Sequence, residues 1–179
     1  MLFASIFAGL IATGTLMAVH AFAGNAGGGL AEAAAPEATP QIVDTRCRVG
    51  TIDFANHGDF IGTTSTAFVD IPGATVTFKQ GGRVADCIKV EFESMSFTTP
   101  NQLLFVRAVL DGAVVGAPGD VQFSGDDDED EDGRWDRSHA MAFFFDGVAP
   151  GTHTVQIQFR SFSGGSVRVN RGSTAVSHR

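Results

Sequence analysis

From Ile42 onward, several short segments alternate apolar and polar residues, as strands with one buried face do. The segments with the clearest alternation are 74–78, 88–93, 154–160 and 166–170. Two further segments, 103–110 and 141–145, are almost continuously apolar, which indicates central strands or strands covered on both faces. Outside the apolar N-terminal stretch, no segment keeps a helical period over three turns. The pattern therefore predicts an all-β domain.

Gly, Pro, Asn and Asp residues separate the predicted strands. Three Pro-Gly pairs, at 72–73, 118–119 and 150–151, each stand directly before a strand-like segment. Proline sets the negative φ of the second turn residue and glycine permits the positive φ of the third, so each pair predicts a type II turn. Strands that follow one another without helices favour antiparallel pairing. We expect an antiparallel, jelly-roll-like β-sandwich of about eight to ten strands.

Two phrases carry a resemblance to known proteins. Residues 150–160 read PGTHTVQIQFR, and residues 68–74 read FVDIPGA. With these phrases the chain resembles uncharacterised bacterial exported β-sandwich proteins and, more distantly, the jelly rolls of the tumour necrosis factor and complement globular-head class. The resemblance extends over residues 42–178 and implies a ten-stranded jelly roll of a kind that forms trimers. It brings no collagen-like stalk, receptor-binding motif or catalytic residue to this sequence.

The N-terminus has the outline of a secretory leader. It is apolar to residue 23, and Ala-Phe-Ala at 21–23 offers a small-x-small cleavage site. No Lys or Arg precedes the apolar stretch, so a weak signal or a mis-assigned start codon stays open. The stretch is just long enough to span a bilayer, which makes an uncleaved membrane anchor the alternative. We expect residues 1–23 to be a signal peptide, 24–41 a flexible linker rich in Gly, Ala and Pro, and 42–179 the sandwich domain. The mature protein is then secreted, either extracellular or periplasmic, and not held in a membrane.

Two cysteines, Cys47 and Cys87, lie in the predicted domain. In an exported protein the default expectation is a disulfide between them, with two unpaired buried thiols as the alternative. Closing a loop of this span would stabilise the fold by roughly 4 kcal/mol.

The acidity of the chain is local. The net charge is −8, and the unbroken acidic run at 126–132 supplies seven of these charges. Such a run repels nucleic acid and favours cations or basic partner surfaces, so we expect no nucleic-acid binding.

Part of the acidic run matches the opening of a calcium-binding loop, D-x-D-x-D-G at 128–133. Oxygen ligands at alternate positions can converge on one cation, and the glycine permits a sharp turn. The candidate ligands are Asp128, Asp130, Asp132 and Asp136. However, His139 occupies the place of the bidentate glutamate, and strand-like segments flank the run, so this is not an EF-hand. The alternative is a solvated loop without a metal, and calcium is the one cofactor that the sequence suggests.

Trp135, the single tryptophan, follows the acidic run. A tryptophan in a loop can stack on a sugar or anchor an interface, and the alternative is a ring folded back over the edge of the sandwich. Neither a G-x-S-x-G motif nor a zinc spacing among the histidines is present. We expect His57-Gly58-Asp59 to form a turn and His153 to be a partly buried, hydrogen-bonded residue at the start of a strand.

The sequence thus favours a secreted, non-catalytic β-sandwich that acts as a structural or interaction module. It would oligomerise, as a trimer by the resemblance, through a face rich in Phe, of which the chain has 16. The first alternative is a carbohydrate- or ligand-binding module with Trp135 in the site and a calcium-ordered acidic loop. The second is a hydrolase with a dispersed site. The expected partner is a protein or a glycan.

Overall fold

The computed structural model describes residues 47–58, 60–125 and 137–179. By its internal contacts the chain divides into two units, Met1–Gln41 and Ile42–Arg179, and every described residue belongs to the second unit. The predicted leader and linker lie outside the described residues, so these boundaries stay predictions. Ten strands are described: β1 (Thr51–His57), β2 (Ile61–Thr63), β3 (Val69–Gln80), β4 (Asp86–Thr98), β5 (Leu103–Leu110), β6 (Val114–Val115), β7 (Val121–Gly125), β8 (Arg137–Val148), β9 (Gly151–Ser161) and β10 (Val167–His178).

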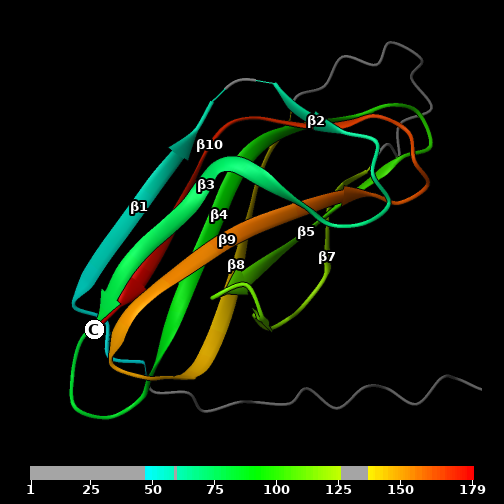
Figure 1. Cartoon of the computed structure of the whole chain (residues 1–179). Coiled ribbons are helices and arrows are strands. Elements are labelled where there is room, and N and C mark those ends of the chain that lie inside the picture. Colours follow the sequence, from blue (N-terminus) through cyan, green and yellow to red (C-terminus); the bar gives the residue numbers. More distant parts are fainter. Residues whose placement is uncertain (1–46, 59, 126–136) are drawn as a thin grey trace, which may run out of the picture. The chain divides into compact units, whose positions relative to one another are not determined.

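The strands form two antiparallel sheets of five strands each. Sheet A has the order β1-β10-β4-β8, with β2 also paired to β10, and sheet B has the order β3-β9-β5-β6, with β7 paired to β5. In Figure 1, strands β3 and β9 of sheet B cross in front of strands β10, β4 and β8 of sheet A. This confirms the predicted antiparallel, jelly-roll-like β-sandwich. In the described ranges, no helix is long and apolar enough to cross a bilayer.

The core lies between the two sheets and is rich in phenylalanine, as the composition predicts. Inward-facing side chains from both sheets form one buried cluster, and its largest fully buried members are Phe92, Phe143 and Phe159. Each comes from a strand in which buried and exposed positions alternate. Burying a side chain of this size contributes about 1.5–3 kcal/mol. The alternation that predicts the strands therefore also supplies the core.

The Pro-Gly pair at 72–73 does not precede a strand, because it lies inside β3. The pairing of β3 with β9 shifts register between Asp70 and Thr75, and Gly73 within this irregularity has a φ of 82°. A Cβ at Gly73 would also lie 3.3 Å from His57 Cα on β1. The glycine thus serves a bulge and a close approach between strands, rather than a turn.

The pair at 118–119 forms a turn of another type than predicted. The Gly119 N–H donates to the Gly116 carbonyl at 2.8 Å, and the Ala117–Pro118 peptide is cis. With a cis proline at its third position, this is a type VI turn instead of a type II turn.

The predicted disulfide is present between Cys47 and Cys87, whose Cα atoms are 5.0 Å apart. Cys47 precedes β1, whereas Cys87 is buried near the start of β4. The bond therefore ties the beginning of the described chain to a strand in the middle of sheet A.

Candidate functional site on the outer face of sheet B

The site residues predicted from the sequence lie outside the described residues. Asp128, Asp130, Asp132, Trp135 and Asp136 fall between the end of β7 at Gly125 and the start of β8 at Arg137. The calcium site and the tryptophan platform therefore stay predictions. In the part of the chain that the structure describes, no three His, Cys, Asp or Glu side chains lie close enough to hold a metal ion.

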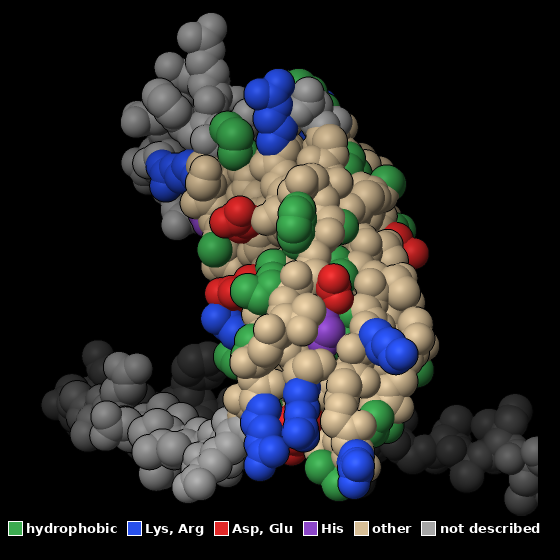
Figure 2. All heavy atoms as spheres, turned by 90° about the vertical axis from the view of Figure 1, so that its left-hand side faces the viewer, with side chains coloured by type: hydrophobic (Ala, Val, Ile, Leu, Met, Phe, Trp, Pro, Cys, Tyr) green, Lys and Arg blue, Asp and Glu red, His purple; other side chains and the backbone are tan. Residues whose placement is uncertain are grey.

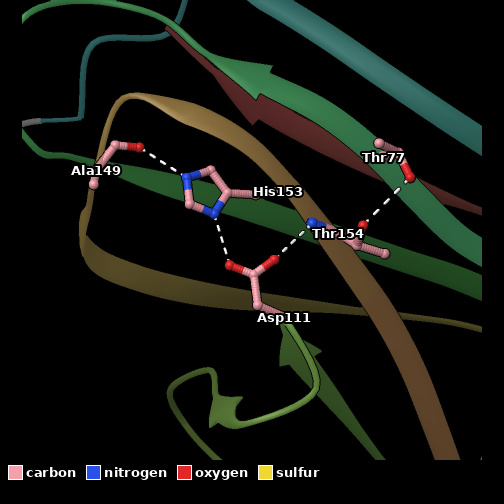
Figure 3. Close-up of polar contacts among 5 residues, drawn as sticks. All are labelled: Thr77, Asp111, Ala149, His153 and Thr154. Atoms are coloured by element: carbon pink, nitrogen blue, oxygen red, sulfur yellow. Dashed lines mark hydrogen bonds and ion pairs between the residues drawn. The ribbon is translucent and has the colours of Figure 1, made fainter.

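The outer face of sheet B carries an ordered set of polar side chains. On β9, the residues Val155, Ile157 and Phe159 are buried, so the alternate side chains point outward. These outward side chains are Thr154, Gln156, Gln158 and Arg160. Thr154 Oγ1 lies 3.4 Å from Thr77 Oγ1 of β3 (Figure 3), and Gln156 Oε1 accepts a hydrogen bond from Thr75. Cross-strand pairs of this kind hold the outward side chains in fixed positions.

A hydrogen-bonded network crosses three strands of this face. Arg107 Nε of β5 donates to Gln158 Oε1 at 2.8 Å, and Gln158 Nε2 donates to Asp70 Oδ1 of β3 at 2.7 Å. Arg107 Nη1 lies 3.9 Å from Asp120 Oδ1, beyond hydrogen-bond distance. The guanidinium and the amide are therefore oriented by the protein before any ligand arrives.

Arginines and phenylalanines alternate beside this network. Arg107 Cζ lies 4.1 Å and Arg160 Cζ lies 5.1 Å from the centre of the Phe68 ring. Arg160 Cζ also lies 4.5 Å from the centre of the Phe105 ring. The Phe105 ring centre is 6.0 Å from that of Phe162, which is 56% exposed. We call these five residues the Arg–Phe ladder.

In the Arg–Phe ladder, the guanidinium of Arg160 is available to bind a ligand. Among the described residues, the Arg160 guanidinium has neither a hydrogen-bond acceptor nor an acidic partner, and its contacts are the rings of Phe68 and Phe105. A guanidinium carries five N–H donors in one plane, so a ring over its flat face still leaves donors at its edge. This face can therefore bind acceptor groups of a ligand beside exposed aromatic surface.

A second polar cluster joins two turns at one end of sheet B (Figure 3). His153 Nδ1 lies 2.7 Å from Asp111 Oδ2, His153 Nε2 lies 2.8 Å from the Ala149 carbonyl, and the Thr154 N–H donates to Asp111 Oδ1 at 2.9 Å. The hydrogen bond to Asp111 raises the pKa of His153 above its ordinary value, and the same bond lowers the pKa of Asp111. Both ring nitrogens are engaged, so in this geometry the imidazole clamps the two turns together rather than presenting a base. The expectation for His153 is confirmed.

The clamp predicts a pH dependence that Asp111→Asn removes. The contribution of His153 to the free energy of unfolding is full below the ordinary pKa of 6.5. It is lost as the pH rises through the raised pKa of His153 in the folded state. The contribution of Asp111 to the free energy of unfolding is full above its ordinary pKa of 3.8. It is lost as the pH falls through the lowered pKa of Asp111 in the folded state. Since both side chains are partly exposed, we expect Asp111→Asn to cost about 0.5–1 kcal/mol between about pH 4 and 6.5, and less on either side.

Urea unfolding at a series of pH values measures this difference. Asp146→Asn, on β8 shortly before the turn that contains Ala149, is the matched control, because the Asp146 carboxylate contacts the Gly147 N–H and not His153. A stability profile of Asp111→Asn with the same shape as that of the wild type would contradict the clamp.

His57 is not in a turn, contrary to the prediction. It ends β1 and is 5% exposed, with Nε2 3.1 Å from Ser94 Oγ and its ring stacked on Phe92 at 5.5 Å. Burial lowers the pKa of His57. Burial, together with the charge of Arg137, also lowers the pKa of His139, which packs against Phe123 inside the sandwich. Both histidines are part of the interior.

A second histidine–aspartate pair, which no sequence motif indicates, lies nearby. His178 Nε2 lies 2.8 Å from Asp53 Oδ2, and the ring of Phe78 lies between His178 and His153, with centre distances of 5.0 and 5.7 Å. Both histidines thus close the same end of the interior around one buried phenylalanine. This arrangement supports the fold rather than a reaction.

Comparison with known proteins gives fold neighbours of low similarity. No protein-family model matches the chain, and no curated protein matches it. The insecticidal delta-endotoxin Cry8Ea1 from Bacillus thuringiensis is 16% identical with a TM-score of 0.41, and the match covers 65% of this chain and 19% of the toxin. The C-terminal CBM6 of LamC, a laminarinase from Zobellia galactanivorans, is 13% identical with a TM-score of 0.35, covering 71% of this chain and 99% of that module. The carbohydrate-binding module CBM6cm-2 of Cellvibrio mixtus lichenase 5A, solved with cellotriose, is 15% identical with a TM-score of 0.36. The match covers 74% of this chain and 99% of that module.

Proposed function

We propose that this chain is an exported, non-catalytic binding module that takes a carbohydrate on the outer face of sheet B. The observation that carries the proposal is the Arg–Phe ladder beside the Asp70–Gln158–Arg107 network. A sugar presents hydroxyls, which both donate and accept hydrogen bonds, and apolar C–H faces that pack on aromatic rings. This face of the sheet offers donors on Arg107, acceptors on Asp70 and an exposed ring at Phe162. Because the polar groups are already oriented, little side-chain entropy is lost on binding.

Two further features favour an exported binding module. The Cys47–Cys87 disulfide fits an oxidising compartment outside the cytoplasm, in agreement with the leader-like N-terminus. The His153–Asp111 pair has both ring nitrogens of His153 engaged and gives the hydrolase alternative no support.

The structural or oligomeric alternative has a weaker basis. Ile52 and Phe54 of edge strand β1 are exposed, but in Figure 2 the hydrophobic side chains on the side that carries β1 are scattered among polar and charged ones. Isolated apolar side chains on a surface are normal and do not mark an interface. The trimer implied by the resemblance remains a prediction, which light scattering on the full chain would test.

The test is binding of the purified full chain to a panel of soluble polysaccharides, with single aromatic substitutions. We expect Phe162→Ala to weaken binding roughly tenfold, because a ring at the end of the ladder is lost. Phe54→Ala is the matched control, since Phe54 is 69% exposed but lies on β1 of sheet A. Trp135→Ala tests the alternative carbohydrate site, in which the sugar stacks on Trp135.

Three outcomes would contradict the proposal. They are the absence of binding to every polysaccharide, equal binding by Phe162→Ala and the wild type, and loss of binding in Trp135→Ala alone. A calcium ion held by Asp128, Asp130, Asp132 and Asp136 remains a separate proposal.

A further inference from the structure

Resting on the function proposed above, we infer that the outer face of sheet B recognises an acidic polysaccharide, a polyuronate whose carboxylates are bound by Arg107 and Arg160. This class of ligand is narrower than the carbohydrates proposed above, because each of its sugars carries a carboxylate that the two arginines can bind.

Arg160 is placed to receive an anion. Its guanidinium lies over the rings of Phe105 and Phe68, and among the described residues it has no acidic partner. The backbone of Arg160 pairs with that of Phe105 on β5, so the side chain rises from the middle of the sheet. Contact with the rings restricts the long side chain and removes water from its flat face, while the in-plane N–H donors stay available. A planar carboxylate matches this row of donors and can accept two hydrogen bonds from it.

Arg107 supplies a second fixed cation on the same aromatic ring. Its Nε is committed to Gln158, and its Nη1 lies 3.9 Å from Asp120 Oδ1, which is too far for a hydrogen bond. The terminal nitrogens of Arg107 therefore retain donor capacity. Since both guanidiniums lie over Phe68, two like charges share one ring, and an anion bound between them would relieve their repulsion.

The surroundings favour a polyuronate over other polyanions. Asp70 and Asp120 flank Arg107, and a phosphodiester backbone brings only acceptor oxygens to these carboxylates, so it is repelled there. A polyuronate has one carboxylate for each sugar, and its hydroxyls can donate to Asp70. The main competing occupant is the acidic run 126–132 of a second copy of this chain.

The experiment titrates the full chain with polygalacturonate, with its fully methyl-esterified form, which keeps the sugar backbone but has no charge, and with dextran sulfate. We expect polygalacturonate to bind, the ester to bind at least tenfold more weakly, and Arg160→Gln and Arg107→Gln each to weaken polygalacturonate binding by roughly tenfold. The matched control is Arg168→Gln. It removes the same charge from an arginine that lies 5.8 Å from the Phe97 ring on sheet A, and it should bind as the wild type does. Melting temperatures of all variants establish that they are folded.

The outcomes separate the inference from the function on which it rests. If the ester binds as tightly as the acid, the carbohydrate function stands and the inference is wrong. If no polysaccharide binds, both are wrong. Equal losses of polygalacturonate affinity in Arg160→Gln and Arg168→Gln would show nonspecific charge attraction. Tighter binding of dextran sulfate than of polygalacturonate would show a sulfate ligand. Either result overturns the inference. Self-association that disappears when the acids at 126–132 are replaced by Asn and Gln, without polygalacturonate binding, would assign the face to a second copy and also overturn it.

Discussion

Reduction of the Cys47–Cys87 disulfide is expected to lower the free energy of unfolding by about 4 kcal/mol. The two cysteines are 40 residues apart in the sequence, so the bond closes a long loop in the unfolded chain. Without the bond the unfolded state gains conformational entropy, whereas the packing around β4 in the folded state changes little. For a domain of this size, such a loss lowers the melting temperature by roughly 10 °C or more.

Urea unfolding with and without a thiol reductant measures the effect. The double variant Cys47→Ala/Cys87→Ala is the control, because its stability should match that of the reduced wild type within about 1 kcal/mol and should not respond to reductant. A reduced wild type that is as stable as the oxidised one would show that the bond does not restrain the unfolded chain.

Gly172→Ala is expected to destabilise the fold by about 3 kcal/mol. Gly172 lies on β10 between His57 of β1 and Ser94 of β4. The His57 ring passes over it to reach Ser94 Oγ, so a Cβ would overlap both the Glu93 carbonyl oxygen and the His57 ring. One obstacle is backbone and the other is a buried ring, and neither can move without breaking sheet A contacts.

Gly58→Ala provides the comparison. A Cβ at Gly58 would meet no atom within 4 Å, so this variant should have nearly wild-type stability. Thermal unfolding of the two variants side by side separates the loss of space at Gly172 from the general effect of replacing glycine. Equal melting temperatures for the two variants would contradict the close packing over Gly172.

The fold could be predicted from local patterns where burial alternates without interruption. The apolar run 103–110 coincides with β5, and the segment 88–93 lies within β4. The strand predicted at 166–170 is shorter than β10, because β10 continues to His178 past a register shift between Asn170 and Gly172. Inward positions are odd before the shift, at Val167 and Val169, and even after it. One extra residue reverses the alternation, so a period of two cannot be followed through a bulge.

Strand β1 was missed for a related reason. Its apolar side chains Ile52 and Phe54 are exposed, whereas Asp53 and His57 of the same strand point inward, where Asp53 meets His178 and His57 is buried. Alternation identifies a strand, but it assigns the faces correctly only when apolar residues lie inside.

The candidate site could be predicted only in part. The outward position of Arg160 follows from the alternation in 154–160, but Phe68, Phe105 and Arg107 reach Arg160 because the sheet order is β3-β9-β5. This order depends on pairings between distant segments, and a single sequence contains no local signal for it. The sequence-based candidates, Trp135 and the acidic run, lie outside the described residues and remain predictions.

Ligand binding on the outer face of sheet B can be located by an amide chemical-shift map of the isotope-labelled full chain titrated with a short oligogalacturonate. If the outer face of sheet B is the binding surface, the largest shifts fall on the amides of β5 and β9 and on Phe68, with small shifts on β10 and β4 of sheet A. Shifts concentrated on sheet A, or on Trp135 with β5 and β9 unchanged, would contradict binding on the outer face of sheet B.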